Sequence, residues 1–115
     1  MNASHILWFQ EISNTDVPLV GGKTASLGEM YRALSADGVL VPNGFAVTAD
    51  AYRLVLDEAD AWDPLRTALE GLDPDSPDDL AARARTAREI VHNAPIPASL
   101  RKEILVAYHA LLDEY

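Results

Sequence analysis

The residues of this chain best suited to chemistry are Gly21, Gly22 and Lys23, which stand just before an apolar helical pattern. Two adjacent glycines let the backbone approach a ligand closely, and the lysine supplies a mobile positive charge. The start of a helix adds backbone N–H groups and the positive end of the helix dipole, which favour an anion. The segment therefore predicts a phosphate-binding turn, with Thr24 as a secondary contact.

Two common phosphate-binding motifs do not fit this segment. A P-loop needs a glycine five positions before Gly22, where the chain has Val17, and Pro18 would lie inside the loop. A dinucleotide fingerprint fails because Gly21, Gly22 and Gly28 do not have its spacing. The run alone favours a plainer interpretation, in which the glycines form a turn, Thr24 or Ser26 caps a helix, and Lys23 is solvated.

The elements that must position these residues follow from the hydrophobic pattern. Residues 5–9 are short, apolar and partly aromatic, which predicts a buried strand, and residues 14–18 are rich in turn formers. A helix is predicted from Thr24 to a stop at Gly38, because apolar residues recur at three- and four-residue spacing. Those residues are Leu27, Met30, Tyr31 and Leu34.

A second strand and four further helices are predicted after Gly38. The strand covers residues 39–48, and Thr48 or Asp50 caps the helix that follows. A short helix spans residues 62–69, another begins at Ser76-Pro77, and the last carries an apolar stripe over residues 100–112. We expect an α+β fold dominated by helix, with about two short strands and about five helices. Two short strands are marginal as an independent sheet, so we expect further strands outside this segment.

Composition excludes several functional classes. The chain has 115 residues, 18 acidic and 9 basic residues, a net charge of −9 and no cysteine. It therefore lacks the basic face of a nucleic-acid-binding protein, as well as disulfides and thiolate sites. No apolar run reaches the roughly 20 residues of a membrane span, and the N-terminus does not match a signal peptide. We expect a cytoplasmic protein that binds neither nucleic acid nor membrane.

The flanks of the glycine-lysine run change its interpretation, because nearly the whole chain resembles a known family. The order of motifs resembles the start of the nucleotide-binding domain, of ATP-grasp type, of the phosphoenolpyruvate synthase and pyruvate phosphate dikinase family, which rifampicin phosphotransferase shares. The specific motifs are Leu7-Trp8-Phe9, Asp16-Val17, VGGKTASLGEM at 20–30, Gly38-Val39 and VPNGFAVTADAY at 41–52. More diffuse similarity follows at Ala87-Arg88-Glu89-Ile90, Pro95-Ile96-Pro97, Ile104, Ala107-Tyr108 and Leu111.

The resemblance implies that Lys23 contacts the phosphates of ATP, with Gly21 and Gly22 shaping the loop and Thr24 as a further contact. It implies a dikinase-type phosphotransferase that uses ATP and Mg²⁺ and transfers phosphate through a carrier histidine. Leu27-Gly28-Glu29-Met30 favours the synthase reaction, in which ATP, pyruvate and water give phosphoenolpyruvate, AMP and phosphate. Rifampicin phosphotransferase and pyruvate phosphate dikinase stay as alternatives, because the phosphate acceptor site is not in these residues.

We expect residues 1–115 to be the N-terminal portion of one such domain, truncated before an Arg-Ser-Ser segment of the family. This implies no metal ligands here, no catalytic activity in isolation, little affinity for ATP, and exposed apolar surface that favours self-association. An alternative of another class is a free-standing helical adaptor that keeps the family scaffold and binds a protein partner. The downstream coding sequence distinguishes the truncated domain from the free-standing adaptor.

Other polar residues favour structural roles. His5, His92 and His109 stand among apolar or helical neighbours, which predicts core or surface positions. The aspartates at 73, 75, 78 and 79 lack the order of a calcium-binding loop, which predicts solvated loop and helix N-terminal charges. Four aromatic residues are predicted to join the strands to the first helices in the core: Trp8, Phe9, Phe45 and Tyr52.

Overall fold

The computed structural model describes residues 5–115 and divides the chain into two compact units. The first unit joins the N-terminal part of the chain up to Tyr52 with Ala98–Tyr115, and the second unit is Arg53–Pro97. The described elements are two strands, two short 3-10 turns and five α-helices. The predicted fold class, α+β dominated by helix, is confirmed.

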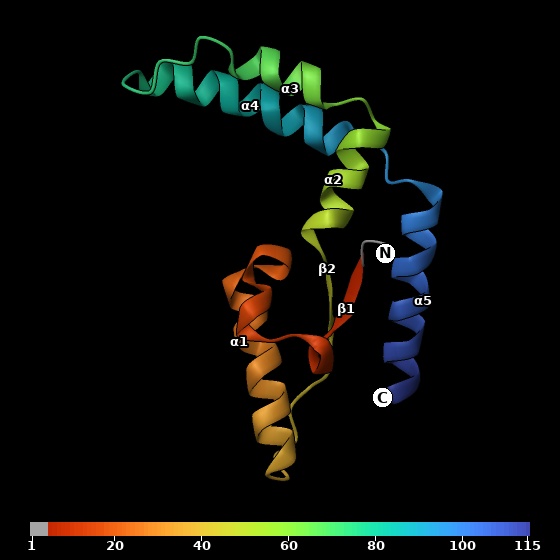
Figure 1. Cartoon of the computed structure of the whole chain (residues 1–115). Helices are drawn as coiled ribbons and strands as arrows, with labels where there is room; N and C mark the ends of the chain where they lie inside the picture. The colour runs from red at the N-terminus through yellow and green to blue at the C-terminus, as the bar shows by residue number, and fades with distance from the viewer. Residues whose placement is uncertain (1–4) are drawn as a thin grey trace. The chain divides into compact units, whose positions relative to one another are not determined.

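A two-stranded antiparallel sheet lies in the first unit. Strand β1 (Ile6–Trp8) pairs with β2 (Phe45–Val47), so that Trp8 stands opposite Phe45. The rings of these two residues lie 5.4 Å apart between centroids, which is within the usual range for aromatic pairs. In Figure 1, α1 (Val17–Ala36) lies beside β2 and α5 (Ala98–Glu114) lies beside β1, and both helices contact those strands.

Two 3-10 turns link β1 to α1. They are η1 (Phe9–Glu11) and η2 (Asn14–Asp16). In η2, the Ser13 hydroxyl accepts from the Thr15 N–H, and the Asp16 carboxylate accepts from the Ser13 N–H at 2.9 Å. This reciprocal arrangement satisfies backbone donors that have no partner within the turn.

The second unit is built around an antiparallel pair of helices, α3 (Trp62–Leu69) and α4 (Pro77–Asn93), which pack on each other. It also contains most of α2 (Ala49–Glu58), which begins in the first unit. The hydroxyl of Ser76 accepts from the Asp79 N–H and caps α4, as predicted. The predicted bounds of α3 are confirmed, and Thr48 rather than Asp50 caps α2, because its hydroxyl accepts from the Ala51 N–H.

Two predictions about the bounds of these elements were wrong. Helix α1 begins at Val17 rather than Thr24, because Pro18 is tolerated in a first turn, where its missing N–H is not needed. Strand β2 begins only at Phe45 rather than at residue 39. Pro42 has no N–H to donate, and the Asn43 N–H donates to the Tyr115 hydroxyl instead of a neighbouring strand.

The buried core is small. In the described residues, only Ile12, Leu56, Leu100 and Thr48 combine a large side chain with nearly complete burial. Tyr52 was predicted to lie in the core but is 51% exposed, and Met30 on the predicted apolar face of α1 is 42% exposed. The expected exposed apolar surface is present, with Leu40, Val106 and Tyr115 among its members. None of the described helices is both long and apolar enough to span a bilayer.

Candidate functional site

Gly21 divides α1 into two helical segments. Its dihedral angles are φ 80° and ψ 164°, whereas the residues on either side are helical. This region of backbone space is essentially restricted to glycine, because a Cβ would clash with the chain's own backbone. The first segment, residues 17–20, therefore ends at Gly21, and a second segment, residues 22–36, begins there with its own positive dipole end.

The start of the second segment is open to solvent. Gly21, Gly22 and Lys23 are all exposed, and Thr24 is half-buried. A Cβ placed on Gly22 would meet no atom within 4 Å, and Gly22 does not have a positive φ. Within residues 5–115, neither packing nor backbone conformation therefore explains why residue 22 is glycine.

The ammonium group of Lys23 makes no hydrogen bond or ion pair within residues 5–115. It stands at the exposed N-terminal end of a 15-residue helical segment, so its charge adds to that of the helix dipole. The four residues predicted for the site, Gly21 to Thr24, thus form one continuous turn, in which the first three are exposed and Thr24 is half-buried. The arrangement is chemically suited to a small anion.

Two contacts that the sequence did not predict stabilise the position of α1, the helix that carries the turn. Ile12, which is fully buried, packs directly on the backbone of α1 at Gly28. The Asn14 N–H donates to the Glu29 carboxylate at 2.9 Å, and the same oxygen accepts from the Arg32 guanidinium at 3.0 Å. Both contacts join the segment before α1 to the middle of the helix. Because the partners are 15 or more residues apart, no local pattern in a single sequence reveals them.

The three histidines lie outside this turn. His92 and His109 are exposed, and the Nδ1 atom of His5 lies 3.1 Å from a carboxylate oxygen of Glu103 at the surface of the first unit. His5 and Glu103 border a shallow groove of about 530 Å³ between β1 and α5, whose other lining residues are mostly apolar. The histidines were predicted to take core or surface positions, and the structure places His92 and His109 at the surface and His5 in a half-buried position.

The aspartates before α4 and in its first turn organise a loop of the second unit. The Asp79 carboxylate accepts from the Asp73 N–H at 2.8 Å and from the Arg83 guanidinium at 3.0 Å. These two hydrogen bonds hold the pKa of Asp79 below its usual value. No group of three or more metal-ligating side chains gathers among residues 5–115, so the loop has no calcium-site geometry.

The comparison with protein families is decisive for the family of the chain. The family model described as "Pyruvate phosphate dikinase, AMP/ATP-binding domain" matches residues 17–115. The chain belongs to this family. The match begins at the first residue of α1 and therefore includes the whole turn from Gly21 to Thr24.

Individual relatives are similar over nearly the whole chain. The chain is 40% identical over 111 residues to the phosphoenolpyruvate synthase of Helicobacter pylori and 44% identical over 110 residues to that of Synechocystis. It is 42% identical over 110 residues to the phosphoenolpyruvate synthase of Aquifex aeolicus. Each alignment covers 96% of this chain but only 13% or 14% of the relative. The chain thus spans about one seventh of the length of the curated relatives it matches.

Proposed function

We propose that Gly21, Gly22 and Lys23 bind the phosphates of ATP, with Thr24 as a secondary contact. The observation that carries the proposal is Gly22. Among the described residues it has neither a packing nor a conformational reason to be glycine, yet it stands beside a lysine that pairs with none of them. A ligand that approaches the backbone would supply the missing reason. Membership of a nucleotide-binding family gives that ligand a chemical class.

The role of Lys23 follows from the charge of the ligand. Phosphoryl transfer depends on positioning and on neutralising negative charge, and little covalent chemistry is required of the protein. The Lys23 ammonium would bind phosphate oxygens while the exposed backbone at Gly22 allows them to come close. Residues 5–115 gather no group of three or more metal-ligating side chains, so the ligands of Mg²⁺ would lie elsewhere in a complete enzyme.

The proposed protein is a cytoplasmic dikinase-type phosphotransferase, in which residues 1–115 contribute the N-terminal portion of an ATP-grasp domain. Phosphoenolpyruvate synthase is the proposed activity, because relatives with that name are 40–44% identical over nearly the whole chain. In that reaction ATP, pyruvate and water give phosphoenolpyruvate, AMP and phosphate. We propose that the isolated chain has no catalytic activity and tends to self-associate.

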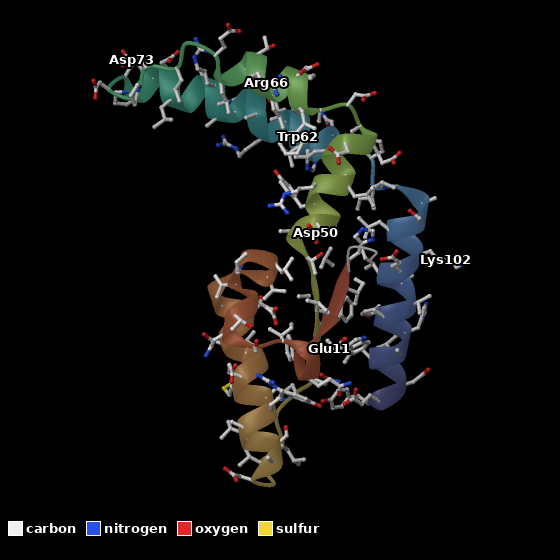
Figure 2. The ribbon with its side chains drawn as sticks, viewed as in Figure 1. Glu11, Asp50, Trp62, Arg66, Asp73 and Lys102 are labelled. Carbon is white, nitrogen blue, oxygen red and sulfur yellow. The ribbon has the colours of Figure 1, made fainter. Side chains whose placement is uncertain are left out.

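Titration of ATP into the ¹⁵N-labelled chain tests the phosphate-binding role. We expect the amide resonances of residues 21–24 to shift at millimolar ATP, with no micromolar affinity. The Lys23→Ala variant should bind about fivefold more weakly, the upper range for a solvent-exposed charge pair. Lys102→Ala is the matched control, because Lys102 is the other lysine of the chain and lies on α5 (Figure 2). Equal ATP responses in the wild type and Lys23→Ala would refute the role.

Transfer of phosphate is tested in a chimera. Residues 1–115 replace the matching N-terminal part of the Synechocystis enzyme, and phosphoenzyme formation from labelled ATP is measured. We expect Lys23→Ala to suppress labelling of the carrier histidine, whereas Lys102→Ala should not. Labelling of the Lys23→Ala chimera at the rate of the unmodified chimera would contradict the proposal.

A further inference from the structure

We infer that Glu29 is a positioning residue, which sets the direction of the phosphate-binding turn from about 9 Å away along the axis of α1. This inference rests on the function proposed for Lys23. Glu29 does not belong to the turn, since it lies six positions after Lys23. Its carboxylate is instead the partner of a backbone N–H in the segment that leads into α1.

The path of the chain explains how a distant carboxylate affects the turn. The segment 13–16 is made rigid by its own reciprocal hydrogen bonds between Ser13 and Asp16. The next residues, 17–20, form a single helical turn that connects this rigid segment to Gly21. Fixing one end of such a short connection therefore restricts the other end, where the Gly21 dihedral angles redirect the backbone.

Two contacts fix the rigid segment to the body of α1. Ile12 packs on Gly28 through close nonpolar contact, which sets the distance between the two segments. The Asn14 N–H donates to Glu29 Oε1 at 2.9 Å, which is directional and sets the orientation. Because Glu29 is charged, this bond is stronger than one between neutral groups. Without it, the segment retains its packing but can rotate about it.

The surroundings of Glu29 indicate that its role is local. Its side chain is 41% exposed, and its other partner is Arg32, one turn further along the same helix. Alanine forms helices as well as glutamate does, so Glu29→Ala should not weaken α1 itself. Glu29→Gln keeps an oxygen that can accept from the Asn14 N–H. Arg32→Ala removes the ion pair and leaves that hydrogen bond intact.

Amide hydrogen exchange of the 115-residue chain, followed by mass spectrometry, tests the anchor directly. We expect Glu29→Ala to raise exchange over residues 14–23 about tenfold, because a directional charge-assisted hydrogen bond is lost. Exchange in the α3–α4 pair should not change. Glu29→Gln should restore most of the protection, and Arg32→Ala should leave it at the wild-type level. Unchanged exchange in Glu29→Ala, or equal effects of Glu29→Ala and Arg32→Ala, would overturn the inference.

ATP titration of the same variants links the anchor to the site. At a temperature where every variant is fully folded, Glu29→Ala should reduce ATP affinity about threefold, and Glu29→Gln should recover it. An exposed side chain that only stabilises the fold would not change the ATP affinity of the folded protein. If the wild type responds to ATP and Glu29→Ala responds equally, the positioning role fails alone. If the resonances of residues 21–24 do not respond to ATP in the wild type, the proposed function fails, whatever the exchange data show.

Discussion

Two parts of helix α1, only seven residues apart, use glycine for opposite reasons. At Gly28 the helix is closed against Ile12, and an added Cβ would lie 2.7 Å from the Ile12 Cβ and 2.8 Å from its carbonyl oxygen. At Gly21 and Gly22 the helix is open, and an added Cβ would meet no atom of residues 5–115 within 4 Å. At the closed part, glycine allows two segments of the chain to pack against each other. At the open part, glycine leaves space that a ligand can occupy.

The comparison predicts that stability and ligand binding respond to different glycines of one helix. Substitution at the closed part should unfold the chain more readily whether or not nucleotide is present. Substitution at the open part should affect nucleotide binding with a smaller change in stability. Three substitutions, ordered by the size of their expected effect on stability, test this separation.

The largest effect is expected for Gly28→Val. The new side chain would collide with the Ile12 Cβ and with a backbone oxygen, neither of which is the flexible end of a side chain. Overpacking of this kind costs about 3 kcal/mol, which exceeds the helix propensity gained by removing glycine. Urea unfolding measures the difference from the wild type.

A double-mutant cycle isolates the contact itself. Ile12→Ala alone should cost about 3 kcal/mol, because it removes a fully buried side chain. The double variant Ile12→Ala with Gly28→Val should lose clearly less than the sum of the single losses, since the collision is relieved. If the losses of stability of the two single variants add strictly, then Gly28 and Ile12 are not in contact.

Gly21→Ala should have the intermediate effect. No atom lies near the new Cβ, but the backbone angles of φ 80° and ψ 164° are unfavourable for any residue with a side chain. We expect a loss of about 2 kcal/mol, or relaxation of the turn to another conformation at a similar cost. Either outcome should also reduce the response to ATP.

Thermal unfolding together with the ATP titration distinguishes backbone strain at Gly21 from a steric clash of the added methyl group. A D-alanine at position 21, introduced by chemical ligation, adds the same methyl group but accepts a positive φ. Stability should therefore return close to the wild-type value. If D-alanine and L-alanine destabilise the chain equally, then the open character of this turn is wrong.

The sequence predicted the parts of the molecule that depend on neighbouring residues. The bounds of α3 and the Ser76 cap follow from signals within a few residues, whereas the phosphate-binding role of the glycine-lysine run stays a prediction. The contact of Ile12 with Gly28 joins residues that only the folded chain brings together. The same holds for the Asn14–Glu29 hydrogen bond and for the short extent of β2, whose strand-like residues 39–44 find no strand partner.

The smallest change in stability, and the sharpest test, is expected for Gly22→Ala. The residue is exposed, its φ is not positive and no atom lies within reach of the new methyl group, so alanine should be tolerated without strain. Alanine is the better helix former, and the chain should gain about 0.5 kcal/mol at this position near a helix end. ATP should nevertheless bind more weakly, because the methyl group occupies the space through which a phosphate approaches the backbone. A variant that is more stable and binds less well separates the open turn from the closed contact. Undiminished ATP binding by Gly22→Ala would leave residue 22 with no explanation in either structure or function, and the open turn would lose the observation that supports it.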